Sequence, residues 1–513
     1  MNNNTLKIIP EPVKSSINDG KFFINSRTKL ISNDLTDDML KFLRKFLKDY
    51  KGLDLNQEEF SHTINYDNAI ILKVMNSNKT MQKESYTLHI SKALIEITAG
   101  EVNGIFYGIQ TLIQIIFLEN IVINEKNESI TLPCLKISDY PRFKWRGFML
   151  DEARHFFGKE TIKKLLDLMA LLKFNIFHWH LTDDQGWRIE IKKYSLLTEI
   201  GSKREGTVIP NAKIARSKGK RKIETDNIPV DGYYTQEDLK EIIQYANERY
   251  ITIIPEIDFP GHVVAALASY PKLSCNGGPF KVSSLFGVHK DVFCIGNEQV
   301  FEFSEDVLKE VMEIFPSKYL HIGGDEVPTR RWNTCEKCQT RIAKEGLNNA
   351  KELQEYYTSR ICSFLKAHEH ILIGWNEILY DNLDIDAVCQ YWTNNFDLVL
   401  EHIKKGRKVI MSEMSTIYLN YPIELTPLRK TYEYDPLPTE LEENYVQNVL
   451  GLEACLWTEI VKDSKMVELR IIPRLLAIGE IGWSPQEVKN FDSFEEKLNS
   501  FYKILDYYKI GYD

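Results

Sequence analysis

Two adjacent carboxylates, Asp325 and Glu326, are the residues of this sequence best suited to acid–base chemistry. They follow two glycines in the run HIGGDE, and glycine lets the backbone or a ligand approach closely. Because two like charges side by side cannot ionise independently, repulsion and partial burial raise the pKa of one of them. Glycosidic bond cleavage needs such an acid, together with a group that stabilises positive charge at the anomeric carbon. The alternative without chemistry is that the acidic pair only caps the following helix.

Three tryptophans accompany these carboxylates. Trp375, Trp392 and Trp457 each lie near the end of an apolar run, and flat aromatic faces suit sugar rings. One such tryptophan alone is typical of a hydrophobic core, because large aromatic residues are mostly buried. Three at equivalent places favour a binding site.

A metal site is the main alternative for the enzyme. His178 and His180 lie two residues apart on a predicted strand and therefore share a face, as in barrel metal sites with an HxH pair. Such a site would take further ligands from His262, His321 or Asp325. The alternative outside enzymes is a carbohydrate-binding barrel without chemistry. We expect no metal and no cofactor.

The eight cysteines are too sparse for a disulfide scaffold. Cys335 and Cys338 form a CxxC pair with no second pair at zinc spacing nearby, so we interpret them as loop thiols. Cys275 and Cys294 flank a glycine-containing stretch, and their pairing is left open. Residues 1–20 lack an apolar block after a basic start, so we expect no signal peptide, reduced thiols and a cytoplasmic protein.

Eight apolar runs that alternate with amphipathic helical stretches follow Pro141. This alternation is typical of parallel strands joined by crossover helices, and eight such units predict a closed (β/α)8 TIM barrel. The active site of such a barrel lies at the carboxyl ends of its strands. The predicted strands are Arg146–Glu152, Phe174–Leu181, Tyr250–Asp258, Tyr319–Glu326, Ile371–Ile378, Ala387–Trp392, Lys408–Glu413 and Val449–Glu459.

A small α+β domain is predicted before the α/β barrel. A chain of 513 residues exceeds a typical single core, and we assign residues 1–139 to a non-catalytic domain and 140–513 to the catalytic barrel. The basic segment Lys203–Lys222 is interpreted as a loop insertion. In the first domain, periodicity predicts strands at 69–75, 86–90 and 94–98 and helices at 38–51 and 103–119.

The charge balance argues against nucleic acid as a partner. The 64 Lys and Arg residues against 73 Asp and Glu residues give a net charge of -9, the wrong sign for binding polyphosphate. The most apolar stretch, Gly104–Ile123, is interrupted by polar residues and predicts an amphipathic helix rather than a membrane span. We expect neither nucleic acid nor membrane as a partner.

Several motifs together resemble the family 20 glycoside hydrolases, the β-N-acetylhexosaminidases. The resemblance implies an exo-acting, retaining enzyme that hydrolyses terminal non-reducing N-acetylglucosamine or N-acetylgalactosamine residues of oligosaccharides or glycoconjugates. In this family the substrate's own acetamido oxygen attacks the anomeric carbon and forms an oxazolinium ion. A homodimer is left open. The motifs are GIFYGIQTLIQ, WRGFMLDEARHFF, FNIFHWHLTDDQGW, IIPEIDFPGH, YLHIGGDEVP, LIGWNE, IYLN, GLEACLWTE and PRLLAIGEIGWS.

The resemblance also implies catalytic roles. Glu326 would be the general acid and base, and Asp325 would orient and polarise the acetamido group. Asp258 and His262, in PEIDFPGH, would support the acid/base through hydrogen bonds rather than hold a metal.

The remaining roles that the resemblance implies concern substrate binding. The acetamido methyl group would lie in a box of tryptophans, and charged side chains would bind the sugar hydroxyl groups. Asn420 stands where many relatives have Asp, which predicts weaker discrimination between gluco and galacto substrates. The implied residues are Arg146 and Asp183 for hydroxyl groups, Trp375, Trp392 and Trp457 for the methyl group, Tyr418 for the acetamido oxygen, and Glu459 for the O4/O6 side.

Overall fold

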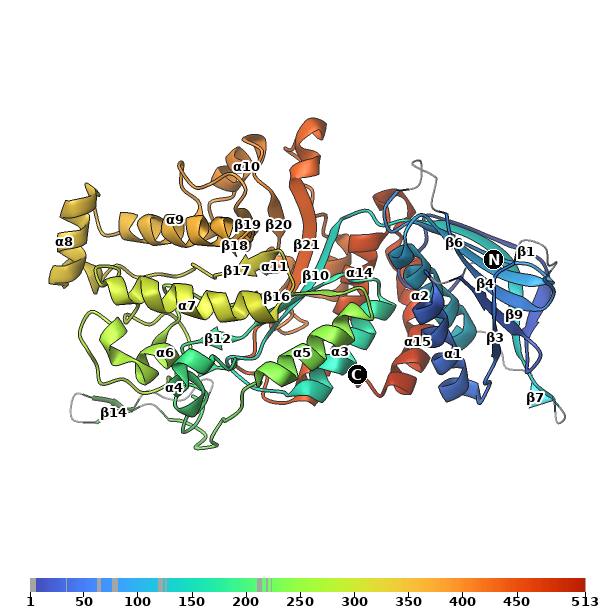
Figure 1. The fold of residues 1–513 in the computed structure, drawn as a ribbon, viewed down its shortest axis with the longest axis horizontal. Helices are drawn as coiled ribbons and strands as arrows, with labels where there is room; N and C mark the ends of the chain where they lie inside the picture. Colours follow the sequence, from blue (N-terminus) through green and yellow to red (C-terminus); the bar gives the residue numbers. More distant parts are fainter. Residues whose placement is uncertain are drawn as a thin grey trace.

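The structure is a computed structural model that describes residues 6–33, 35–61, 66–75, 82–118, 123–124, 127–209, 215–217, 220–222 and 224–512. A seven-stranded mixed sheet with its helices precedes a closed barrel of eight parallel strands (Figure 1). This architecture confirms the predicted fold class, a TIM barrel preceded by a small α+β domain.

All eight predicted barrel strands form, in sequence order around the barrel, and β10 closes the ring by pairing with β21. Several strands end earlier than predicted. The fourth ends at His321, because Gly323 and Gly324 have φ of 64° and 89°, values that a strand does not adopt. The strands are β10 (Trp145–Asp151), β11 (Ile176–His180), β16 (Thr252–Glu256), β17 (Tyr319–His321), β18 (Ile371–Trp375), β19 (Val388–Tyr391), β20 (Val409–Met411) and β21 (Val449–Leu456).

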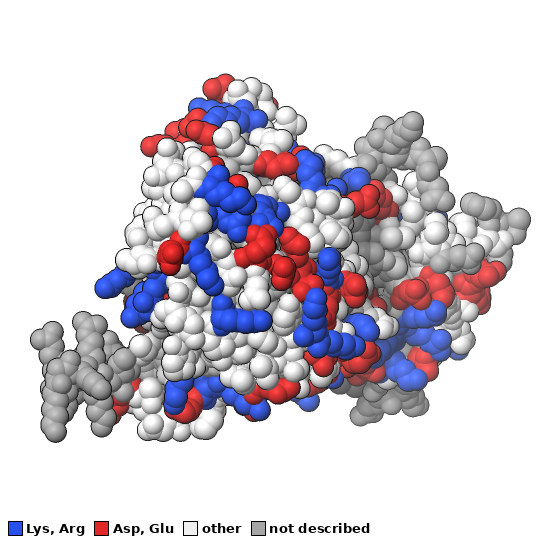
Figure 2. All heavy atoms as spheres, turned by 60° about the vertical axis from the view of Figure 1, so that its left-hand side comes forward, with Lys and Arg blue, Asp and Glu red and all other residues white. Residues whose placement is uncertain are grey.

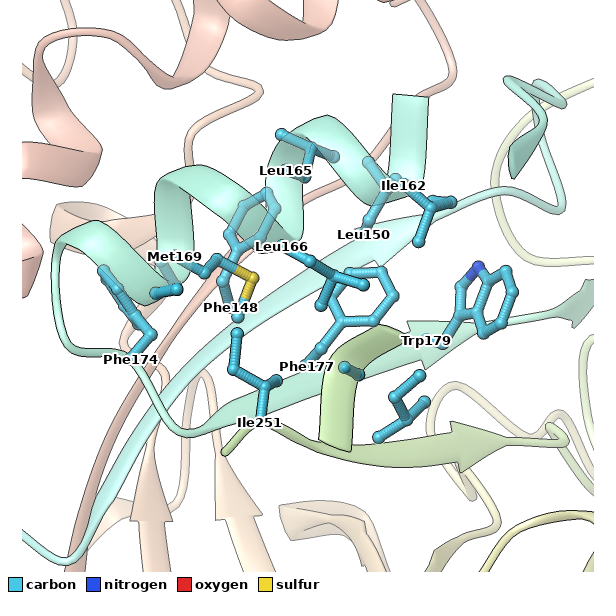
Figure 3. Packing of buried hydrophobic residues seen from close by; sticks show 14 of the residues in the cluster. Phe148, Leu150, Ile162, Leu165, Leu166, Met169, Phe174, Phe177, Trp179 and Ile251 are labelled. Carbon is cyan, nitrogen blue, oxygen red and sulfur yellow. The ribbon is translucent and has the colours of Figure 1, made fainter. Parts of the chain in front are cut away.

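Helices cover the outside of the barrel, and the alternation of side chains along each strand decides what they contact. Phe148 and Leu150 point outward from β10 and pack on Ile162 and Leu166 of α3, as Figure 3 shows. Each such buried side chain contributes about 1.5–3 kcal/mol. The larger covering helices are α3 (Lys159–Leu171), α5 (Gln236–Asn247), α7 (Glu298–Ile314), α9 (Glu352–Ala367), α10 (Phe396–Lys404), α13 (Ser464–Ile471) and α14 (Arg474–Trp483).

The first domain is a sheet in the strand order β1-β9-β5-β6-β4-β2-β3. Its helices α1 (Asp37–Lys51) and α2 (Val102–Leu118), with the C-terminal helix α15 (Phe491–Tyr508), lie between the sheet and the barrel (Figure 1). The strands are β1 (Lys14–Ile24), β2 (Lys29–Ser32), β3 (Asn56–Glu59), β4 (Ala69–Val74), β5 (Tyr86–Ile90), β6 (Leu94–Ala99) and β9 (Ile130–Asp139).

The helix α2 explains the most apolar stretch of the sequence. It is buried on all sides from Gly104 to Phe117, rather than amphipathic as predicted, because it packs on the sheet on one side and on barrel helices on the other. Its polar Gln114 is satisfied by hydrogen bonds with the backbone of Ile9 and Leu171. Among the described helices, none combines the length and apolar character that crossing a bilayer requires.

The segment Lys203–Lys222 is only partly described. Its two short strands, β14 (Ala215–Ser217) and β15 (Lys220–Lys222), pair as an antiparallel hairpin. Residues 210–214 and 218–219 of this predicted insertion lie outside the described residues. Over the face of the molecule drawn in Figure 2, the described basic and acidic side chains are interspersed.

Arg146 joins the two domains. It is the second residue of β10 and only 1% exposed, and its Nη1 and Nη2 atoms donate to Glu84 of the first domain at 3.0 and 2.9 Å. The same guanidinium donates to the backbone oxygens of Lys173 and Phe143, both at 2.7 Å. Its Nη2 atom also donates to the Tyr107 hydroxyl at 3.2 Å, so all five N–H groups of Arg146 have a hydrogen-bond partner at the domain junction.

Replacing Arg146 with Met is expected to lower the free energy of unfolding by about 3–5 kcal/mol, because Glu84 is left buried without its counter-ion. Lys29→Met, which breaks an exposed pair with Glu58, serves as the control and is expected to cost about 0–1 kcal/mol. Urea unfolding measures both. Equal losses in the two variants would contradict the assigned role of Arg146.

Candidate active site

A pocket of about 160 Å³ opens at the carboxyl ends of the barrel strands. Most of the residues predicted to bind substrate meet there, although they come from separate strands and loops. The lining residues are Arg154, His262, Asp325, Glu326, Trp375, Trp392, Met414, Tyr418, Asn420, Tyr421, Trp457 and Glu459.

The two glycines before the acidic pair are required by the geometry of the turn. Both have positive φ, and a Cβ atom at Gly323 would lie 1.9 Å from Oδ1 of Asp258. That same Asp258 oxygen accepts a hydrogen bond from the Gly324 N–H at 3.2 Å. The close approach fixes the turn that carries Asp325 and Glu326 into the pocket.

Asp325 is the more buried member of the acidic pair, with 14% of its side chain exposed against 37% for Glu326. Burial, reinforced by the charges of Glu256 and Glu326, raises the pKa of Asp325 to about 6. Its Oδ1 atom has no hydrogen-bond partner among the described residues. A buried acceptor of this kind favours a ligand that brings an N–H or O–H group.

His262 links this pair to a second carboxylate pair. Its Nδ1 lies 3.3 and 3.2 Å from Asp183 and Asp184, and its Nε2 lies 3.8 Å from Asp325 and 3.6 Å from Glu326. Burial opposes protonation of the ring, yet the charge of Asp183 and its hydrogen bonds raise the pKa of His262 well above the ordinary value. The predicted supporting role of His262 therefore has a geometric basis.

His262 and Glu326 share an unusual backbone conformation. Both are non-glycine residues with φ of 50°, a left-handed region that costs on the order of 1–3 kcal/mol and persists only where the surroundings enforce it. The side chains of these two residues, which both line the pocket, approach to 3.6 Å between His262 Nε2 and Glu326 Oε2.

The wall of the pocket is aromatic. The rings of Trp375 and Trp457 lie 5.7 Å apart, and Trp392 and Tyr418 stack at 6.2 Å with 10° between their planes. The indole N–H of Trp375 is held by Glu256 at 2.9 Å. Burial raises the pKa of Tyr418 well above its usual range, so its hydroxyl group stays a hydrogen-bond donor.

Arg154 is the arginine of the pocket, and the prediction of Arg146 for this role is wrong. Arg146 lies at the amino end of β10, about 16 Å of extended chain from its carboxyl end, and its guanidinium is held in the domain junction. Arg154 follows the carboxyl end of the same strand and packs 5.0 Å over the Trp457 ring. The barrel rule itself favours Arg154, which lies in the quoted motif WRGFMLDEARHFF.

Asp183 lies behind the pocket rather than on its surface. It is 2% exposed, and its Oδ2 accepts from Arg154 at 2.9 Å. Although burial opposes ionisation, Arg154 and His262 lower the pKa of Asp183 well below its usual value. This carboxylate holds Arg154 and His262 in place. The prediction that Asp183 binds sugar hydroxyl groups is therefore wrong.

Two residues that the sequence reasoning did not single out complete the site. Glu377 accepts from the Trp392 indole N–H at 3.0 Å, and burial together with the charge of Asp325 raises the pKa of Glu377 to about 7. Tyr421 adds a ring next to Tyr418. Glu377 belongs to the quoted motif LIGWNE, and only the fold shows that it supports an indole.

His178 and His180 form part of a charged network inside the barrel. The Nδ1 atom of His178 lies 2.7 Å from Glu453 and its Nε2 lies 3.1 Å from Glu256. Burial opposes protonation, but the charges of Glu453 and Glu256 raise the pKa of His178 to about 9. Both ring nitrogens of His178 therefore lie within reach of carboxylates inside the barrel, which gives this histidine a structural role in the network.

The comparisons with known proteins agree with this geometry. Residues 143–486 match the model described as glycosyl hydrolase family 20, catalytic domain, and residues 5–140 match domain 2 of the same family. The chain belongs to glycosyl hydrolase family 20.

Relatives in this family are similar along nearly the whole chain. A β-hexosaminidase of Porphyromonas gingivalis is 38% identical over 99% of this chain, and one of Vibrio furnissii is 32% identical over 93%. The chain spans 64% and 76% of the lengths of these two relatives.

A solved structure of a family 20 enzyme has a similar fold along nearly the whole chain. The family 20 exo-β-N-acetylglucosaminidase of Vibrio harveyi, in complex with N-acetylglucosamine, has a TM-score of 0.84 at 29% identity. The match covers 99% of this chain and 78% of that one.

The glycine turn of this family 20 chain generates a stability prediction. Gly323→Ala adds a Cβ atom into the Asp258 carboxylate, whereas Gly52→Ala, at a matched φ of 68°, meets nothing within 4 Å. The left-handed conformation alone costs about 1–2 kcal/mol in either variant. We expect Gly323→Ala to lose clearly more stability than Gly52→Ala in urea unfolding, and equal losses would refute the tight turn.

Proposed function

We propose that the chain is an exo-acting, retaining β-N-acetylhexosaminidase that uses the acetamido group of its substrate as the nucleophile. The observation that carries this proposal is the buried, unpartnered Oδ1 atom of Asp325 beside Glu326 in an aromatic pocket. The substrate would be a glycan or glycoconjugate with a terminal β-linked N-acetylhexosamine. Relatives named β-hexosaminidases support this class of substrate.

The size and lining of the pocket support one terminal sugar as the bound unit. Its volume of about 160 Å³ is well below the roughly 300–1,000 Å³ of pockets for drug-sized ligands. The tryptophans offer an apolar box for the acetamido methyl group, while Arg154 and Glu459 offer charged partners for hydroxyl groups.

The first step closes a ring within the substrate. The acetamido oxygen attacks the anomeric carbon while the glycosidic C–O bond breaks, and Glu326 gives its proton to the leaving oxygen. Asp325, as the carboxylate, accepts a hydrogen bond from the acetamido N–H and stabilises the positive charge of the oxazolinium ion. Tyr418 would position the attacking oxygen by donating its hydroxyl proton in a hydrogen bond.

The second step restores the enzyme. Water attacks the anomeric carbon from the face that the leaving group vacated, and the Glu326 carboxylate takes the proton of that water. The bond to the acetamido oxygen breaks, so the sugar leaves with its original β configuration. Because the nucleophile belongs to the substrate, proximity within one molecule supplies much of the rate.

The direct test is hydrolysis of a chromogenic β-N-acetylglucosaminide, followed by proton NMR of the fresh product. Initial release of the β anomer supports retention. Initial release of the α anomer would mean direct displacement by water, and binding without turnover would favour a carbohydrate-binding barrel.

Asn420 bears on sugar preference. It lines the pocket, and its Oδ1 has no hydrogen-bond partner among the described residues, so it can accept from a hydroxyl group without supplying charge. We propose that N-acetylglucosamine and N-acetylgalactosamine are both accepted.

Glu326→Gln is expected to lose about 10²–10⁴-fold in kcat while still binding N-acetylglucosamine, because only the proton donor is removed. Turnover of the aryl glycoside and binding of the free sugar by calorimetry measure the two effects. Wild-type kcat would remove Glu326 from this role, and loss of sugar binding as well would point to a collapsed pocket.

The pH dependence of kcat/KM is expected to follow the ionisation of Asp325, whose pKa is raised to about 6. The carboxylate form is the active one, so kcat/KM should rise as pH increases through about 6 and fall off below it. Asp325→Asn should remove this acid limb and lower kcat by about 10²–10³-fold. A variant that keeps both the limb and the rate would argue against substrate assistance.

Location in the cytoplasm and pairing of two chains stay predictions. The prediction of a cytoplasmic protein rests on the sequence alone, on sparse cysteines and the lack of an apolar block in residues 1–20. Cell fractionation and light scattering of the purified protein test the two points.

A further inference from the structure

Four cysteines from three parts of the chain form one cluster, which we name the tetracysteine cluster. Cys275, Cys294, Cys335 and Cys338 place their sulfurs within 4.8 Å of one another. The sequence predicted Cys335 and Cys338 as isolated loop thiols, because their partners are distant in the chain. The structure corrects this, since folding supplies the second pair.

The sulfur spacing is that of ligands around one tetrahedral ion. Cys294 Sγ lies 3.6 Å from Cys335 Sγ and 3.7 Å from Cys338 Sγ, and Cys275 Sγ lies 3.8 Å from Cys338 Sγ. A tetrahedral site with Zn–S bonds of about 2.3 Å places its sulfurs about 3.8 Å apart. A disulfide needs about 2.05 Å, and all four thiols are free.

The local backbone forms this geometry in two halves. Cys335 precedes helix α8 (Glu336–Glu345) and Cys338 lies in its first turn, which is the usual CxxC half of a zinc site. Cys275 and Cys294 are brought together by the bridge between Ser274 and Phe293.

The two halves are held against each other by contacts that need no metal. A Cβ atom at Gly296 would lie 2.1 Å from the Lys337 carbonyl carbon, so glycine allows the loop to touch the start of α8. The indole N–H of Trp332 donates to the Phe293 oxygen at 2.7 Å.

The surroundings favour a structural rather than a catalytic metal. Cys294, Cys335 and Cys338 are buried and Cys275 is partly buried, and four protein sulfurs leave no open position for substrate. None of the four lines the pocket. The four-sulfur donor set suits zinc, or iron as the rival soft-ligand ion.

We propose that the tetracysteine cluster binds one structural Zn²⁺ ion. Binding converts four thiols to thiolates, so up to four protons leave as four Zn–S bonds form. The ion would fasten the loop after β16, which carries His262, to the loop after β17, which carries Asp325 and Glu326. The proposal concerns folding of the chain and does not depend on the proposed activity.

The test is the metal content of the full-length protein purified from zinc-supplemented cells. We expect one zinc per chain by mass spectrometry of metals, and release of that zinc from the folded protein by an organomercurial reagent that caps thiols. Replacement of zinc by cobalt should give the visible absorption of a tetrahedral thiolate site.

Substitutions locate the ion. Cys335→Ser and Cys338→Ser should lose the zinc and lower Tm, while Cys362→Ser, a buried cysteine of α9 outside the cluster, should keep it. If the serine variants fail to fold, mercurial release from the wild type still decides. Four metal-free thiols, disulfides within the cluster, iron in place of zinc, or full zinc in both cluster variants would each overturn the proposal.

Discussion

The site depends on the burial of several carboxylates with few positive charges to balance them. Asp183 and Asp258 are buried behind the pocket that Asp325 lines. The cationic partners close to them are Arg154, His262 and His180. Asp183 contacts all three, and although burial opposes ionisation, Arg154 and the two histidines hold its pKa well below the usual value. Burial and the charge of Asp325 raise the pKa of Asp258 well above its usual range.

Asp325 and Glu326 are adjacent in the chain but lie in different surroundings, which gives them different roles. Asp325 is enclosed and has a free acceptor atom, whereas Glu326 reaches further into the pocket opening. The glycine turn sets that difference, because it brings the backbone onto Asp258 and leaves Glu326 in a left-handed conformation opposite His262. Trp375, Trp392 and Trp457 line the same pocket as the enclosed acid.

The sequence was informative wherever the chemistry followed from a local pattern. The eight barrel strands were predictable from alternating apolar runs, and the carboxyl-end rule located Asp325, Trp375, Trp392 and Trp457. The resemblance implies a substrate-binding role for Arg146, but the burial of this side chain against Glu84 depends on a domain contact that no local pattern reveals. The contacts of Asp183 with Arg154 and His262, and the gathering of the four cysteines, likewise form only in the folded barrel.

One measurement bears most directly on substrate assistance: the hydrolysis of two chromogenic β-glycosides that differ only at carbon 2. One carries the acetamido group and the other a hydroxyl group, with the same aryl leaving group and the same enzyme preparation. The account predicts turnover of the acetamido sugar and little or none of the plain glucoside, because the nucleophile is missing from the second. Equal cleavage of both would require a nucleophile on the protein and would contradict the account.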